Sequence, residues 1–264
     1  MSVIETGKIF ILIVFAIYWI VKFASHYLVD QGKISTAVAR IPAFDAIDEL
    51  IDRCVEMGRP AFYTLGDWAM LMGRDAPATV AGLNVLRYVA KQTAEKNVPL
   101  YVGLSIGQTY PITVDAVREA YASVNRLNAF ELDHILYWSD LWSAFITGEF
   151  HTMDKEKPAA YMNIGIAADS STNVPGYSRV QGYDMMSIGG CDDRTQIPPM
   201  IYGCDFWLVS EELFAAGQYA SGEKEAGGGM VASDIFKLLI IALLVIGAIG
   251  ALLGTNLISE LLKI

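Results

Sequence analysis

The chain has 264 residues, of which 53% are hydrophobic, and its mean hydropathy is +0.37. These values are high for a soluble protein and indicate that part of the chain lies in a membrane. The formal net charge of −10, together with the lack of a basic stripe, an RNA-binding motif or zinc-finger spacing, argues against nucleic acid as a partner.

The first apolar segment lies close to the N-terminus. Residues 9–21 carry no charge, and after Lys22 the apolar character resumes to Val29, so the segment is about 20 residues long and can cross a bilayer. Lys22 can extend toward the headgroups, and Trp19 is typical of the membrane interface. A cleaved signal peptide is the alternative, but no small-residue cleavage site follows. We therefore predict a transmembrane helix within residues 1–29.

Between residues 30 and 226, apolar runs alternate with amphipathic stretches. The apolar runs predict strands at 60–66, 98–105, 134–139, 158–168, 185–190 and 205–210. The amphipathic stretches predict helices at 43–58, 77–97, 112–125, 140–157, 169–184 (interrupted at Pro175) and 211–222, with a helical turn in 193–204. This alternation predicts an α/β fold with a mostly parallel, Rossmann-like sheet that is covered by helices on both faces.

A glycine-rich linker over residues 227–234 leads into a second predicted transmembrane helix, 235–264. Its core, residues 238–258, is free of charge for about 20 residues, as a membrane span requires. Gly250 and Gly254 form a GxxxG motif, and Gly247 lies one turn earlier. Such small residues let another helix approach closely, although the motif also occurs by chance.

The basic residues near the two spans indicate how the chain is oriented. They gather on the side of the middle domain, with Lys22, Lys33, Arg40, Lys224 and Lys237 there, against Lys8 and Lys263 on the outer flanks. We therefore expect an inner-membrane protein with a cytoplasmic middle domain and both termini outside. The three cysteines, Cys54, Cys191 and Cys204, form no CxxC motif and fit a reducing compartment.

Acidic and small residues follow the predicted strands. In an open α/β sheet, ligands bind beyond the carboxyl ends of the strands, so these residues form a candidate acidic rim for a divalent cation. The acidic members are Asp67, Asp140, Asp169, Asp192 and Asp193, and the small ones are Gly66, Ser105, Gly107, Ser139, Ser170, Ser171, Gly189 and Gly190. Because Asp and Ser are also preferred helix N-caps, capping is the alternative role for each of them.

The stretch SIGGCDDRTQIPP, residues 187–199, has the composition of a catalytic loop. The two neighbouring carboxylates disfavour a thiolate at Cys191, unless Arg194 compensates for their charge. We interpret the stretch as a turn between a strand and a helix, in which Asp192 or Asp193 caps the helix. A cation or substrate site is the alternative.

The sequence lacks the usual motifs of cofactor binding and catalysis. There is no GxGxxG, GxxxxGK[ST], GxSxG or CxxCH motif, and the three histidines, His26, His134 and His151, have no metal-binding spacing. We therefore predict no cofactor, while a divalent cation stays possible at the acidic rim.

The layout of the chain resembles an uncharacterised family of prokaryotic two-span membrane proteins, a domain of unknown function. The resemblance is carried by residues 40–60, 78–102, 117–125, 156–165 and 195–221 between two apolar ends. It implies a central Rossmann-like domain between two spans, and it supplies no activity or site residue.

Two functions fit the sequence. Two anchors and the lack of a strong catalytic motif favour a non-enzymatic membrane scaffold or accessory subunit, which assembles laterally with itself or with a larger membrane complex. The alternative is an α/β domain that binds a small molecule or a divalent cation at the acidic rim, either as a binding domain or as an enzyme.

Overall fold

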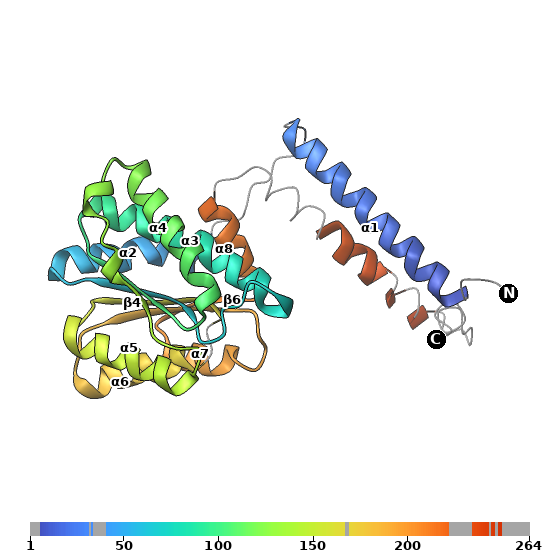
Figure 1. Ribbon diagram of the computed structural model, residues 1–264. Coiled ribbons are helices and arrows are strands. Elements are labelled where there is room, and N and C mark those ends of the chain that lie inside the picture. The colour runs from blue at the N-terminus through green and yellow to red at the C-terminus, as the bar shows by residue number, and fades with distance from the viewer. Residues whose placement is uncertain are drawn as a thin grey trace. The chain divides into compact units, whose positions relative to one another are not determined.

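The computed structural model of the protein describes residues 6–31, 33, 41–166, 169–221, 234–242, 244–245 and 248–249. The chain divides into two compact units. One is Val38–Gly222, and the other joins Met1–Ala37 with Glu223–Ile264. Figure 1 shows the elements of each unit.

Six parallel strands form the sheet of the first unit. They are β1 (Ala61–Gly66), β2 (Leu100–Leu104), β3 (Ile135–Tyr137), β4 (Ala160–Ile166), β5 (Met186–Cys191) and β6 (Phe206–Val209), and their order is β3-β2-β1-β4-β5-β6. The predicted α/β fold is therefore confirmed, and the all-parallel sheet fits a Rossmann-like architecture. In this order the direction of winding reverses between β1 and β4, which is the switch point where such sheets bind ligands.

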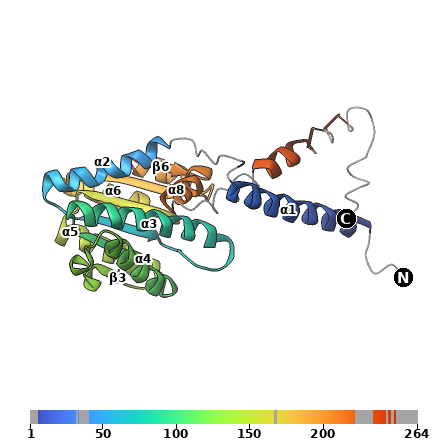
Figure 2. The same ribbon diagram turned by 90° about the horizontal axis from the view of Figure 1, so that it is seen from above.

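Helices cover both faces of the sheet (Figures 1 and 2). On one face lie α2 (Pro42–Met57), α3 (Ala76–Lys96), α4 (Tyr110–Ser123) and α8 (Glu211–Ser221). On the other lie α5 (Trp142–Glu156), α6 (Ser170–Gln181) and α7 (Ile197–Gly203). Short 3₁₀ turns lie in the connections, at Gly73–Asp75, Gly107–Thr109, Leu127–Ala129 and Leu132–His134.

Helix α2 shows how local chemistry sets the ends of an element. Ile41 is extended and Pro42 occupies the first helical position, where its missing N–H costs nothing. Gly58 ends the helix at φ 60, and its N–H and that of Arg59 bond the last carbonyls.

The apolar residues form a separate core on each side of the sheet. The larger core lies under α2, α3, α4 and α8. The smaller core contains Phe62, Met153, Tyr161 and Val174, and the rings of Phe62 and Tyr161 stack with 5.7 Å between their centres. Because Met153 lies on α5 and Val174 on α6, this smaller core lies on the α5/α6 face.

The predicted interruption at Pro175 is wrong, because α6 continues through this residue. A proline lacks the N–H that would bond the carbonyl four residues earlier, which is that of Ser171. Here the Cys204 thiol donates to that carbonyl at 3.2 Å. The side-chain bond replaces the missing backbone bond, and the helix is not broken.

We expect Gly82→Ala to lower the free energy of unfolding by about 1–3 kcal/mol, because a side chain there overpacks the contact between α3 and the sheet. A Cβ on Gly82 would overlap the carbonyl oxygen of Ile164, and the Gly82 carbonyl accepts the Tyr63 hydroxyl at 2.7 Å. Thermal unfolding of the two proteins measures the effect. The matched control is Gly176→Ala in α6, where a Cβ meets nothing within 4 Å and alanine should stabilise the helix by up to about 1 kcal/mol. Equal effects of both changes would contradict the packing argument.

The second unit contains helix α1 (Thr6–Asp30) and a short helical stretch near the C-terminus. Within α1, Leu12–Val29 is long and apolar enough to cross a membrane, with a mean hydropathy of 1.8, and it is the one such helix among the described residues. Tyr18 of α1 contacts Phe236 with 5.0 Å between the ring centres. Most of the second predicted span, including Gly247, Gly250 and Gly254, lies outside the described residues, as does nearly all of the predicted linker.

Candidate functional site

The backbone at the switch point is shaped by two glycines. Pairing between β1 and β4 changes register between Thr64 and Gly66. Gly66 has a φ of 96 and Gly165 a φ of 141. Residues that carry a side chain rarely adopt such positive φ values. A Cβ on Gly66 would overlap the carbonyl oxygen of Ile166. The ends of the two strands therefore approach each other more closely than other residues would allow.

Beside these glycines lies a buried polar cluster, which we define as Asp67, Glu149, Tyr161, Asn163 and Ser170. Asp67 directly follows β1, Glu149 lies on α5 and Ser170 is the first residue of α6. Tyr161 and Asn163 alternate along β4, so both face the α5/α6 side of the sheet. Asp67 is 2% exposed and Glu149, Asn163 and Ser170 are 0% exposed, so the cluster is shielded from water.

Hydrogen bonds satisfy only part of the polar cluster. The Ser170 hydroxyl donates to Asp67 Oδ1 and also interacts with the Glu149 carboxyl. The Tyr161 hydroxyl donates to Glu149 Oε1 at 3.2 Å. Asp67 Oδ2, Glu149 Oε2 and both polar atoms of the Asn163 amide have no hydrogen-bond partner among the described residues. A buried polar group without a partner costs about 1–3 kcal/mol, so these atoms are candidates for contacts to a bound ligand.

Burial changes the acidity of both carboxyls. It raises the pKa of Asp67 from 3.8 to about 6, although the bond from Ser170 acts in the opposite direction. It also raises the pKa of Glu149 well above its ordinary value, and the charge of Asp67 adds to this effect. Two acids with raised pKa values at the switch point of a parallel sheet are typical of a functional site.

Of the five predicted aspartates, Asp67 belongs to the polar cluster, and Asp169 directly precedes another member of the cluster, Ser170. Asp169 occupies the N-cap position of α6, but its side chain makes no capping bond. Its charge helps to raise the pKa of Asp67. Asp140 lies elsewhere, where it accepts hydrogen bonds from the Gly107 N–H at 3.3 Å and the Tyr137 hydroxyl at 2.9 Å.

Asp192 and Asp193 lie in a turn between β5 and α7, as predicted, but neither caps the helix. The N-cap of α7 is Gln196, which has no side-chain capping bond. Asp193 instead accepts the N–H of Thr195 at 2.8 Å and pairs with Arg74. The capping prediction is therefore wrong for α7 itself, but Asp193 caps the turn that leads into it, since its carbonyl also accepts the N–H groups of Gln196 and Ile197.

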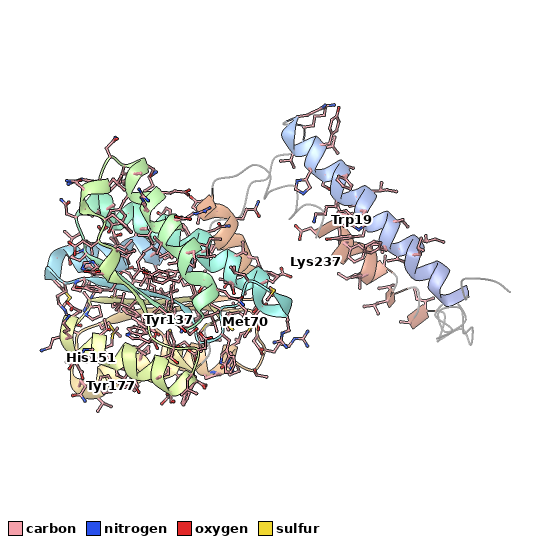
Figure 3. The ribbon with its side chains drawn as sticks, viewed as in Figure 1. Trp19, Met70, Tyr137, His151, Tyr177 and Lys237 are labelled. Atoms are coloured by element: carbon pink, nitrogen blue, oxygen red, sulfur yellow. The ribbon has the colours of Figure 1, made fainter. Side chains whose placement is uncertain are left out.

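The described residues contain no group of three His, Cys, Asp or Glu side chains that could hold a metal ion. The histidines also lie apart. His134 pairs with Glu131 at 3.1 Å, and His151 lies on α5 in the outer layer (Figure 3). A cation site made by the predicted aspartates therefore stays a prediction, and the polar cluster draws on other residue types.

Sequence reasoning missed Glu149, Tyr161 and Asn163. Glu149 was missed because charged residues are common in an amphipathic helix. It lies four residues after Phe145 and four before Met153, however, and thus on the buried stripe of that helix. Asn163 interrupts the apolar run of β4. A charged or amide side chain on a buried face is the signal that could have identified both residues.

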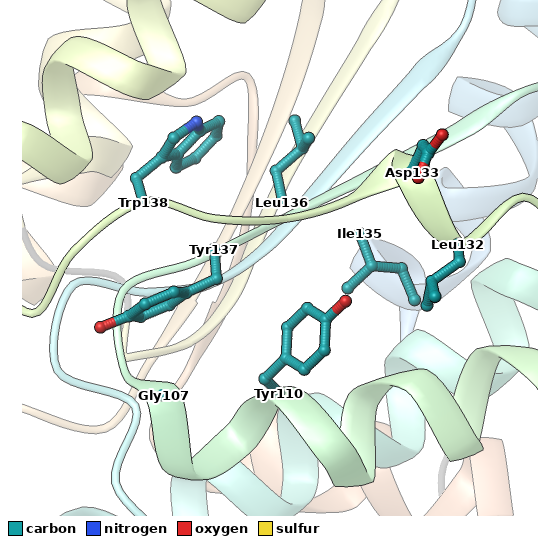
Figure 4. A pocket seen from close by; sticks show the side chains of 8 residues that line it. All are labelled: Gly107, Tyr110, Leu132, Asp133, Ile135, Leu136, Tyr137 and Trp138. Atoms are coloured by element: carbon teal, nitrogen blue, oxygen red, sulfur yellow. The ribbon is translucent and has the colours of Figure 1, made fainter.

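A hollow lies at the edge of the sheet beside β3 (Figure 4). It is an open pocket of about 720 Å³, lined by Gly107, Tyr110, Leu132, Asp133, Ile135, Leu136, Tyr137 and Trp138. Figure 4 shows Tyr110 at the start of α4, across from Ile135. Asp140 bonds two of the lining residues, whereas neither Asp67 nor Glu149 lines the pocket. Its lining is mostly apolar and lacks converging polar groups.

These features define a doubly wound α/β domain with a buried acidic switch point, in a chain that also carries an apolar helix long enough to span a membrane. The chain belongs to the family described as a domain of unknown function, DUF6754, which matches residues 2–262. No curated protein matches the chain, and no solved structure does.

Proposed function

We propose that the chain is a membrane-anchored α/β domain that binds a small ligand at its switch point. The observation that carries this proposal is the polar cluster, in which two carboxyl oxygens and an entire amide are buried without partners among the described residues. Structural residues in a core are normally apolar or fully hydrogen-bonded. The cluster therefore costs stability in the ligand-free protein, and a ligand would offset this cost.

The charges around the cluster favour a ligand with positive charge or hydrogen-bond donors. The groups whose charges act on the two carboxyls are themselves acids, since Asp67 acts on Glu149 and Asp169 acts on Asp67. The donors that reach the carboxyls are the hydroxyls of Ser170 and Tyr161 and the backbone N–H groups of Asp169 and Ser170. None of these hydroxyl and backbone N–H donors carries a charge that could balance a carboxylate.

The test is the thermal stability of the full chain in mild detergent, with and without the small-molecule fraction of a cell extract. We expect this fraction to raise the unfolding midpoint of the parent protein and not that of Asp67→Asn, because a ligand that binds only the folded state stabilises it. An unchanged midpoint, or an equal rise in the variant, would count against a ligand at the switch point.

The second candidate function is a scaffold or accessory subunit that assembles in the membrane. The observation that favours it is a contact between the two ends of the α/β domain, where Phe44 in the first turn of α2 packs against Tyr219 in α8 with 5.0 Å between ring centres. The chain therefore enters and leaves the domain at one place. Two anchors attached there would hold one side of the domain toward the membrane, which suits lateral repetition. A particle that is monomeric in mild detergent and carries no other subunit would contradict this function.

We further propose that both terminal segments span the inner membrane, with the α/β domain in the cytoplasm and both termini outside. The apolar helix within α1 and the basic residues on the inner flanks support this orientation.

A further inference from the structure

We propose that the buried polar cluster is a site for one hard divalent cation, Mg²⁺ or Ca²⁺, held between Asp67, Glu149 and Asn163. This inference rests on the proposed binding function and names the class of its ligand.

The available donor atoms are all of one chemical type. Asp67 Oδ2 and Glu149 Oε2 are carboxyl oxygens without a partner among the described residues, and the Asn163 amide offers a third free oxygen. Mg²⁺ and Ca²⁺ bind carboxylate and amide oxygens, and they complete their shells with water. The Cys204 thiol is engaged with the Ser171 carbonyl, and the donors of the cluster include none of the sulfur atoms that zinc favours.

The donors come from three elements that are linked to one another by contacts within the cluster. Asn163 Oδ1 lies 3.2 Å from the position that a Cβ on Gly66 would take, and Gly66 directly precedes Asp67. Tyr161, two residues before Asn163 on the same face of β4, holds Glu149 by its hydroxyl. The Ser170 hydroxyl contacts both carboxyls and so joins the end of β1 to α5.

The amide distinguishes this arrangement from an acidic cluster alone. Asn163 is 0% exposed, and neither its oxygen nor its nitrogen has a partner among the described residues. A buried asparagine without hydrogen bonds has no structural benefit over leucine. An oxygen ligand beside two carboxylates accounts for its presence, because two negative charges and one neutral oxygen match a divalent cation.

The full chain in mild detergent, freed of metal with EDTA and then dialysed, is titrated with MgCl₂ and with CaCl₂. We expect one of these salts to raise the unfolding midpoint by roughly 5–10 °C at 100 times its dissociation constant, and calorimetric titration to give one ion per chain. Asp67→Asn and Glu149→Gln should abolish the rise, and Asn163→Leu should weaken binding at least tenfold. The control Asp192→Asn/Asp193→Asn, which removes the carboxylates of the β5–α7 turn, should keep the full rise.

Three outcomes would overturn the inference: no binding of either ion to the parent protein, an undiminished rise in Asp67→Asn and Glu149→Gln, or a rise that only the Asp192→Asn/Asp193→Asn control abolishes. A parent protein that binds neither ion overturns the inference even if a variant fails to fold. If the small-molecule fraction still stabilises the parent after all divalent ions have been chelated, while the two salts do not, then the proposed binding function stands and the cation fails.

Discussion

In metal-free buffer, the parent protein should lose stability as the pH rises from 4 to 8, and Asp67→Asn and Glu149→Gln should lose much less. Burial raises the pKa of both carboxyls in the folded state. An acid whose pKa is raised by folding contributes fully to stability below its unfolded pKa, and this contribution is lost as the pH rises through the folded pKa. For Asp67 the loss falls between about pH 4 and its folded pKa of about 6.

The expected loss of stability follows from the change in the pKa of Asp67 on folding. A tenfold change in an acid dissociation constant corresponds to about 1.4 kcal/mol, so raising the pKa from 3.8 to about 6 costs about 3 kcal/mol at pH 8. In a domain of this size, that is roughly 6–12 °C in the unfolding midpoint. Asp67→Asn should recover most of it at pH 8 and almost none at pH 4. Glu149→Gln should act in the same direction, since glutamine keeps an oxygen to accept the Tyr161 hydroxyl.

A matched control is available on the surface of α5. Asp154 accepts hydrogen bonds from the hydroxyls of Tyr177 and Tyr183, and these bonds lower its pKa. Its contribution to stability is therefore present above its unfolded pKa and is lost as the pH falls. Asp154→Asn should reduce stability at neutral pH and have less effect in acid, which is opposite to Asp67→Asn. If the stability of the parent, of Asp67→Asn and of Glu149→Gln changed equally with pH, burial of these two carboxyls would not be what destabilises the folded protein.

The sequence predicted the strands well because each is a short apolar run next to a turn residue. For example, β1 was expected at 60–66 and spans Ala61–Gly66, and β4 was expected at 158–168 and spans Ala160–Ile166. Both strands are buried along their whole length, as central strands of a parallel sheet are. Hydrophobic pattern alone therefore gave the fold class.

The candidate site was predicted only in part, because its residues come together through tertiary contacts. Asp67 could be placed, since the carboxyl end of a strand is a local feature of the sequence. Glu149 comes near Asp67 only after α5 packs against the sheet, and Asn163 only after β4 pairs with β1. The same holds for α6, where the Cys204 thiol from a distant turn satisfies the carbonyl that Pro175 leaves free. Local propensity predicted a break there, and a long-range bond prevents it.

Removing residues 1–31 should leave the protein in the membrane fraction, whereas removing both 1–31 and 235–264 should release it into the soluble fraction. Each segment is expected to span the bilayer alone. Leu12–Val29 has a mean hydropathy of 1.8, and residues 238–258 carry no charge. In the described part of the second segment, Leu238 and Leu244 are 67% and 66% exposed. Burying such a side chain in lipid gains about 1.5–3 kcal/mol, so one intact span is enough for stable insertion. Alkaline extraction followed by sedimentation measures the result.

The orientation of these two spans can be read with a membrane-impermeant thiol reagent, because the native cysteines should not react. Cys54, Cys191 and Cys204 are all buried, and burial raises the pKa of Cys54 and of Cys204 to about 12, so little thiolate is present at neutral pH. A single cysteine introduced at position 2 or 262 should therefore be labelled in intact cells, while one introduced at the exposed Val180 of α6 should be labelled only after lysis. Labelling of Val180→Cys in intact cells would place the domain outside. Release of the protein by removing residues 1–31 alone would instead show that the C-terminal segment does not span the membrane, and a domain with a single anchor would no longer be held at both ends.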